Sequence, residues 1–209
     1  MKTILFDLGG VLLNLDYQKT IDAFISLGIE DFKQLYAQAA QTALFDDFET
    51  GKISSEKFMN GIREISGISL SDNQIQSAWN AMLLDLPKHR VDLLKALSKH
   101  YQLLLFSNTN AIHLDAFRKI IEDQYGNRFL LEDLFEGTYY SHLEGVRKPN
   151  KEAFLHVLRK KGLQPEDVLF IDDSIQHVEG ALAIGVNAHH LVKGEVRELL
   201  KSIGIHGID

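Results

Sequence analysis

Three sites along the chain place polar side chains directly after short runs of apolar residues. At the first site, Asp7 follows the apolar residues 4–6. At the other two, Ser107 and Asn108 follow residues 103–106, and Asp172 and Asp173 follow residues 168–171. The carboxyl ends of parallel strands meet at one edge of a sheet, where open α/β proteins bind their ligands. We therefore expect these side chains to converge in one crevice. Lys148, which follows a weaker strand candidate at 137–141, is expected in the same place.

This set of side chains permits a narrow range of chemistry. Carboxylates that share a crevice repel each other by roughly 1 to 4 kcal/mol per pair at about 4 Å. A Mg²⁺ ion removes that penalty, because it binds one or two carboxylates together with waters and a substrate phosphate. The carboxylate of Asp7 can then attack phosphorus and divide the hydrolysis into two easier steps. Ser107 would hold phosphate oxygens and Lys148 would balance the charge of the phosphoryl group.

The apolar runs are typical of strands that are buried on both faces of a parallel sheet. Residues 188–192 are a further, weaker strand candidate, and helical patterns lie between the strands from about residue 100 onward. This order predicts an α/β fold with a doubly wound parallel sheet, a Rossmann-like core. Residues 16–86 contain no convincing strand, so we expect a core of 1–15 and 87–209 with an inserted, all-helical cap of 16–86.

Helical spacing supports the predicted cap. Ser71 and Gln74 fit a capping box. The apolar residues behind them share one helical face, and they are Ile75, Ala78, Trp79, Met82 and Leu83. Trp79 is therefore expected in the core of the cap, and Pro87 is expected to mark the return to the sheet. Asp46 and Asp47 are expected in a solvated turn.

Composition limits the partners. The chain has 209 residues, with 22 basic and 29 acidic side chains and a net charge of −7. This balance argues against broad binding to nucleic acids or to anionic membranes, and a small phosphorylated substrate would need positive charge supplied locally by Lys, Arg or a metal. There is no Cys, and no apolar run approaches a membrane span or the apolar part of a signal peptide. We expect a cytoplasmic protein.

Taken together, four motifs resemble those of the haloacid dehalogenase superfamily in order and rough spacing. They are residues 7–12, residues 107–109, Lys148-Pro149 and Asp172-Asp173. The predicted cap is similar to that of the helical-cap subfamily, and residues 48–53 resemble its sugar-phosphate and α-glucose-1-phosphate phosphatases. The resemblance implies a Mg²⁺-dependent phosphatase.

The resemblance also implies roles for single residues. Asp7 would be the nucleophile and, with the main-chain carbonyl of Gly9, a metal ligand. Ser107 and Asn108 would contact phosphate, and Lys148 would bridge phosphate and nucleophile. The last two ligands would be Asp173, bound directly, and Asp172, bound through water.

Two positions depart from the family pattern. Most phosphatases of the family have a second Asp two residues after the nucleophile, as general acid and base, where this chain has Gly9. His177 occupies a position where the family tends to have Asn. Two other functions stay open: a metal-independent 2-haloacid dehalogenase, which also lacks the second Asp, and a phosphate-binding protein with little catalytic activity. The paired acids Asp172 and Asp173 argue against the dehalogenase, because it has no cation to compensate them.

Some of these residues also have ordinary structural interpretations. Ser107 and Asn108 could cap the helix that begins near residue 111. Arg147 is expected on the surface, and His113, His142 and His177 fit no zinc-binding spacing.

Overall fold

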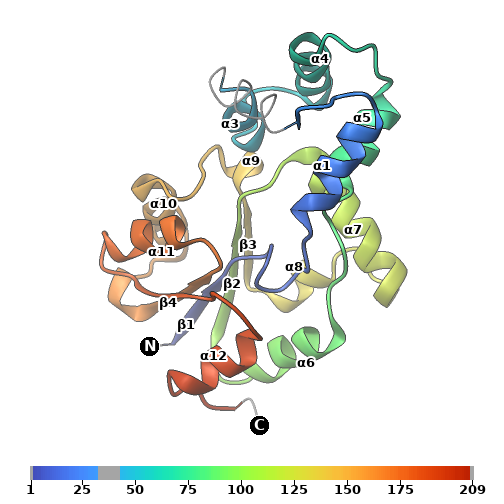
Figure 1. Ribbon diagram of the computed structural model, residues 1–209. Coiled ribbons are helices and arrows are strands. Elements are labelled where there is room, and N and C mark those ends of the chain that lie inside the picture. Colours follow the sequence, from blue (N-terminus) through green and yellow to red (C-terminus); the bar gives the residue numbers. More distant parts are fainter. Residues whose placement is uncertain (1, 33–42, 208–209) are drawn as a thin grey trace.

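A parallel β-sheet forms the centre of the computed structural model, which describes residues 2–32 and 43–207 (Figure 1). Within the described residues the sheet has the strand order β3-β2-β1-β4-β5. The strands are β1 (Thr3–Phe6), β2 (Gln102–Ser107), β3 (Gly137–Tyr140), β4 (Val168–Asp172) and β5 (Asn187–His190). All neighbouring pairs are parallel. The predicted fold class, an α/β protein with a doubly wound parallel sheet, is confirmed.

Both faces of the sheet are covered, which explains why its central strands read as continuous apolar runs. Ile4 and Phe6 of β1 pack into one hydrophobic cluster, and Leu5 between them packs into another on the opposite face. The edge strand β5 is partly exposed along its length, and its sequence pattern is correspondingly weaker. Strand β1 is the central strand of the sheet, and all four of its residues are buried.

The helices after residue 87 accompany the sheet, and most of them cover one of its two faces. They are α6 (Lys88–Leu97), α7 (Ala111–Tyr125), α8 (Leu130–Leu134), α9 (Ser141–Glu144), α10 (Lys151–Lys161), α11 (Ile175–Leu182) and α12 (Val196–Ser202), with a short 3₁₀ turn at Pro165–Asp167. Phe117 of α7 and Leu200 of α12 belong to the cluster on one face, whereas Phe154 of α10 and Ala181 of α11 belong to the other. Figure 1 shows α10 and α11 on the opposite side of the sheet from α7.

The described part of the predicted cap is helical. It contains α1 (Tyr17–Ser26), α3 (Leu44–Glu49), α4 (Ser55–Ser66) and α5 (Asp72–Asn80). These helices share a hydrophobic cluster of their own, in which Phe24, Phe58 and Trp79 are buried. Residues 33–42 lie outside the described residues, and the domain boundaries at 15/16 and 86/87 stay a prediction. Asp46 and Asp47 belong to α3, so the predicted turn at this position is wrong.

The capping box of Ser71 and Gln74 is present at the start of α5. The same helix ends at Asn80, earlier than the apolar pattern predicts, so Met82 and Leu83 follow the helix. The helix ends here because the carbonyl of Trp79 accepts hydrogen bonds from the side chains of Thr20 and His113, in place of a main-chain N–H further along the helix. The N–H of Met82 donates to Thr20 Oγ1 in turn.

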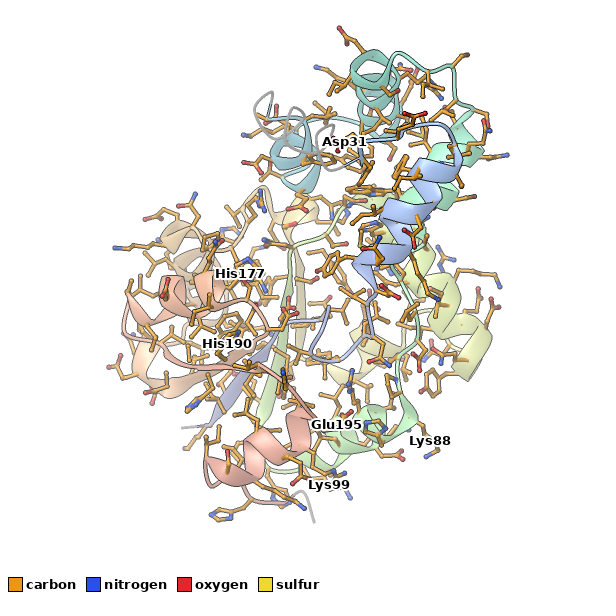
Figure 2. The ribbon with its side chains drawn as sticks, in the orientation of Figure 1. Asp31, Lys88, Lys99, His177, His190 and Glu195 are labelled. Atoms are coloured by element: carbon orange, nitrogen blue, oxygen red, sulfur yellow. The ribbon has the colours of Figure 1, made fainter. Side chains whose placement is uncertain are left out.

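A buried arginine ties the C-terminal helix to the rest of the core. The side chain of Arg90, on α6, donates to the carbonyl of Leu12, to Asn14 Oδ1 at 3.0 Å and to the carboxylate of Glu195 at 3.0 and 3.2 Å. Glu195 directly precedes α12, and Figure 2 shows it close to α6.

Among the described residues, no helix combines the length and the apolar character that a membrane crossing requires.

Candidate active site

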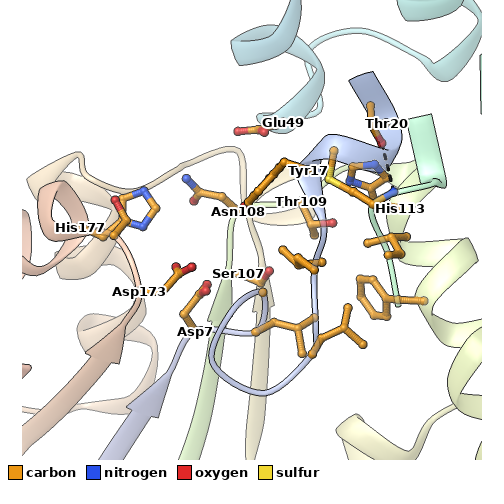
Figure 3. Close-up of a pocket in the computed structure, with 18 of the residues that line it drawn as sticks. Asp7, Tyr17, Thr20, Glu49, Ser107, Asn108, Thr109, His113, Asp173 and His177 are labelled. Atoms are coloured by element: carbon orange, nitrogen blue, oxygen red, sulfur yellow. Dashed lines mark hydrogen bonds between the residues drawn. The ribbon is translucent and has the colours of Figure 1, made fainter. Parts of the chain in front are cut away.

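The carboxyl ends of β1, β2 and β4 bring the predicted side chains together. Phe6 pairs with Leu105 and Ile171, and the N–H of Asp7 donates to the carbonyl of Ile171. Figure 3 shows Asp7, Ser107 and Asp173 facing the same cavity. Residues that are distant in sequence therefore meet because their strands are neighbours.

Lys148 lies beneath this cavity and has no exposed surface. Its Nζ donates to Asp7 Oδ1 and to Asp172 Oδ2, each at 2.6 Å. The rings of Phe106 and Phe170 flank the ammonium group at 5.4 and 5.3 Å. Burial of a charged ammonium is costly unless anionic partners of this kind compensate it. The two carboxylates and the lysine therefore stabilise one another in their charged forms.

Protonation at this cluster depends on burial and on the neighbouring charges. Burial by itself would lower the pKa of Lys148, but the carboxylates of Asp7 and Asp172 outweigh it and raise the pKa. Burial raises the pKa of Asp7 to about 7, Lys148 opposes that shift, and Asp172 and Asp173 add to it. Since only the carboxylate form is nucleophilic, a further positive charge near Asp7 would favour the reactive form.

The two adjacent acids have different surroundings. Asp172 is fully buried and accepts hydrogen bonds from Lys148, from the N–H of Ser174 at 2.8 Å and from His177 Nδ1 at 3.0 Å. Despite its burial, Lys148 and His177 lower the pKa of Asp172. Asp173 instead lines the cavity, and burial together with Asp172 raises its pKa.

Gly10 gives Asp173 the room it needs. This glycine has a φ of +73°, and a Cβ at its position would collide with the carboxylate of Asp173.

The cavity above the carboxylates has a volume of about 890 Å³. Its floor is formed by the strand ends, and its roof includes residues of the helical segment such as Tyr17, Thr20 and Glu49 (Figure 3). A cavity of this size can enclose a complete small organic molecule.

A comparison with known families identifies this arrangement. The sequence model of one family, the haloacid dehalogenase-like hydrolases, matches residues 1–185 of this chain. These residues include every polar residue described at the strand ends. The chain belongs to the haloacid dehalogenase-like hydrolases. It is therefore a hydrolase.

Similar proteins agree with this assignment. The chain is 28% identical to the D-ribitol-5-phosphate phosphatase of Bacteroides thetaiotaomicron, over 88% of this chain and 89% of the relative. It is 29% identical to a sesquiterpene phosphatase of Aspergillus oryzae, over 95% and 96%. A HAD family enzyme of Bacteroides thetaiotaomicron, crystallised with magnesium and inorganic phosphate, matches with a TM-score of 0.80 and 37% identity, over 91% of this chain and 93% of that one.

The acidic residues of this hydrolase fit a divalent cation. Carboxylate oxygens of Asp7, Asp172 and Asp173 lie within 4.8 Å of one another. When ionised, these three groups and Lys148 carry three negative charges and one positive charge, so two negative charges are uncompensated. Oxygen ligands and this residual charge suit Mg²⁺. Gly9, the other predicted ligand, also lines the cavity, and the part of its carbonyl in metal binding stays a prediction.

Ser107 and Asn108 are not the cap of the following helix. Asn110 caps α7, because its Oδ1 accepts from the N–H of His113 at 3.0 Å. The side chain of Asn108 clamps the main chain of Lys148, accepting from its N–H and donating to its carbonyl, both at 2.9 Å. Ser107 and Asn108 both line the cavity, and their contacts with phosphate stay a prediction.

Two cavity residues were missed by sequence reasoning. Arg147, expected on the surface, lines the cavity and forms ion pairs with Asp46 and with Glu49, the latter at 3.0 Å. Burial raises the pKa of Glu49 to about 7, and the charge of Lys148 opposes that shift. The resemblance of residues 48–53 to the phosphatase subfamily was the signal that could have directed attention to Glu49.

Proposed function

We propose that this hydrolase is a Mg²⁺-dependent phosphatase that cleaves a small phosphorylated metabolite through an aspartyl-phosphate on Asp7. The single observation that carries the proposal is the charge balance around Asp7. A buried lysine compensates one carboxylate, and two negative charges remain for a divalent cation at the edge of the cavity. The named activities of both relatives, and the magnesium and phosphate bound to the similar structure, support the same reaction and cofactor.

In the first step, a carboxylate oxygen of Asp7 forms a bond to phosphorus while the bond from phosphorus to the ester oxygen breaks. Lys148 holds the attacking carboxylate in place, and Ser107 donates to a phosphate oxygen. Asp7, Asp173 and the carbonyl of Gly9 would hold Mg²⁺, with Asp172 bound through water, and the ion would supply charge stabilisation. In the second step, water attacks the phosphorus of the aspartyl-phosphate, which regenerates Asp7 and releases inorganic phosphate.

The other two functions have less support. A 2-haloacid dehalogenase needs no metal, and Asp173 would then stand beside the nucleophile as an uncompensated acid. Halide release in the presence of a chelator would identify that activity. Any Mg²⁺-dependent turnover of a phosphate ester would exclude the phosphate-binding protein without activity.

The direct test compares phosphate release by wild type and Asp7→Asn. Chelation by EDTA should abolish release and added Mg²⁺ should restore it. Asp7→Asn should lower kcat by more than about 10³-fold, because an amide is a poor nucleophile and a poor Mg²⁺ ligand. Asp123→Asn is a matched control, since Asp123 lies on the surface with a side chain that is 62% exposed. Turnover that survives either treatment would contradict the proposal.

A further inference from the structure

The cavity has two chemically distinct ends. Asp7, Asp173 and His177 mark one end, and Thr20 and His113 lie on the other side of the cavity (Figure 3). The second end lies around Trp79, whose carbonyl binds both Thr20 and His113. Its apolar lining residues are Leu13, Leu15, Ile21, Met82, Leu83 and Phe117.

The polar side chains of this second end are already engaged. Thr20 Oγ1 donates to the carbonyl of Trp79 and accepts from the N–H of Met82. His113 donates from Nε2 to the same carbonyl at 3.1 Å, so its Nδ1 must be the acceptor for the amide of Asn110 at 3.2 Å. Burial lowers the pKa of His113 to about 4, so the ring is neutral at pH 7. His113 therefore has no spare hydrogen bond for a substrate hydroxyl, and Thr20 has no spare donor and one remaining acceptor site.

Few polar groups are left there for a substrate. The hydroxyl of Thr109 lines the cavity, and the indole N–H of Trp79 has no hydrogen-bond partner among the described residues. Glu49 and Arg147 lie toward the roof and are paired with each other. Even with the hydroxyl of Tyr17, which also lines the cavity, these few groups fall short of the several hydroxyls of a polyol, each of which needs a donor and an acceptor when it is buried.

We infer that the substrate is a phosphate monoester of a large, apolar alcohol, whose hydrocarbon part fills the end of the cavity around Trp79 while its phosphate lies at Asp7. The inference rests on the proposed phosphatase function and narrows its substrate. It differs from the sugar phosphate that the family resemblance implies. Each buried methylene favours binding by about fourfold. Each hydroxyl buried without a partner disfavours it by about fivefold to more than a hundredfold.

The test measures kcat/KM for pairs of esters that differ only in the polarity of the alcohol. Straight-chain alkyl phosphates from methyl to octyl have leaving groups of nearly constant pKa, so a trend among them reports binding of the chain. We expect kcat/KM to rise by about fourfold per methylene until the cavity is filled, and pentyl phosphate to exceed a pentitol phosphate by at least about tenfold. A pentitol phosphate that is the better substrate would overturn the inference and leave the phosphatase proposal intact. Absence of Mg²⁺-dependent release from every ester, acetyl phosphate included, would overturn the phosphatase proposal itself.

Variants of the wall locate the effect. Leu83 is only partly buried, so Leu83→Asn places an amide on the wall with the same number and branching of heavy atoms. This variant should lower the ratio of kcat/KM for octyl phosphate to that for acetyl phosphate by about tenfold or more. Leu83→Met, which keeps the wall apolar, should leave this ratio within about twofold of the wild-type value. Leu143→Asn is the matched control, because Leu143 is 65% exposed and does not line the cavity. Equal losses for the two substrates in a folded Leu83→Asn protein would contradict the apolar wall.

Discussion

At the scale of single residues, the two adjacent acids have different surroundings. Asp172 has no exposed surface and accepts from Lys148, Ser174 and His177, whereas Asp173 faces the cavity. Adjacent residues at a strand end point to opposite sides. The direction of each side chain therefore underlies the different roles proposed for the two acids, a structural role for Asp172 and direct metal binding for Asp173.

This division predicts different defects for the two substitutions. Asp173→Asn should weaken Mg²⁺ binding by at least about tenfold and change the free energy of unfolding by less than about 1 kcal/mol. Asp172→Asn should lower the free energy of unfolding by about 3 kcal/mol, because Lys148 loses one of its two buried anions. Mg²⁺ titration and urea unfolding, performed on both variants without substrate, separate the two effects. A larger loss of metal affinity in Asp172→Asn would reverse the assignment.

Gly9 leaves the first motif without a carboxylic acid beside the leaving oxygen. General acid catalysis typically contributes about 10² to 10⁴ in rate, so kcat/KM should depend steeply on the pKa of the leaving group, with aryl and acyl phosphates ahead of alkyl phosphates. In Gly9→Asp the slope should become shallower. A Cβ at Gly9 would lie 2.6 Å from Leu15 Cδ1, the mobile end of a side chain, so Gly9→Ala controls for crowding. A flat series in the wild type would show that another acid is already in place.

At the scale of secondary-structure elements, Arg147 connects helix α3 of the predicted cap to the loop that carries Lys148. Its guanidinium lies 3.0 Å from Glu49, and both side chains are largely shielded from solvent, 31% and 23% exposed. Ion pairs between partly buried groups couple more strongly than those in open solvent. The contact therefore joins the predicted cap directly to the loop that carries Lys148.

A double-mutant cycle tests this connection. Arg147→Gln should lower the free energy of unfolding, because it leaves the buried Glu49 without its partner, and this effect should be smaller by about 1 kcal/mol in the Glu49→Gln background. Lys52 and Asp47 provide the control cycle, because this pair lies within the predicted cap at 3.4 Å and the lysine is 67% exposed. Its coupling should be close to zero. Equal coupling energies in both cycles would mean that the ion pair of Arg147 and Glu49 stabilises the protein no more than an exposed ion pair does.

Sequence reasoning succeeded where chemistry coincides with local pattern. Asp7 and Ser107 follow apolar runs that form β1 and β2, so the sequence indicates both the strands and the residues at their ends. It failed where a distant residue decides the outcome. The end of α5 depends on Thr20 and His113, and the placement of Arg147 depends on α3. No periodicity along the chain reports such contacts, because each joins elements that are separate in sequence.

At the scale of the whole molecule, an ion pair joins α6 to Glu195, the residue before α12. Hydrogen bonds from Arg90, and then from His89, lower the pKa of Glu195 to about 2, compared with an ordinary value of 4.5. Since the folded-state pKa is the lower one, the ion pair stabilises the protein above about pH 4.5, and this contribution is lost as the pH falls toward 2. The Glu195 side chain is 43% exposed, so solvent screening reduces the contribution to about 1 kcal/mol.

We therefore expect Glu195→Gln to destabilise the protein by about 1 kcal/mol at pH 7 and to have a progressively smaller effect below pH 4.5. Urea unfolding of wild type and variant at pH 7, 4 and 3 measures the difference. Glu198→Gln, on the exposed face of the same helix, is the control and should behave like the wild type at each pH. A difference that stays constant down to pH 3 would contradict the assigned pKa.

The central place of β1 has a consequence for biosynthesis. Ile4 is synthesised long before Leu103 and Leu169, its two partners in the sheet. At ordinary rates of translation, the second partner is made roughly 8 to 33 seconds after the first strand. The helices between β1 and β2 can begin to gather their hydrophobic cluster during this interval, while the strand itself has both edges unpaired. The residue proposed as the nucleophile is thus synthesised well before it is positioned, and a nascent chain cannot assemble the candidate active site until β4 has been made.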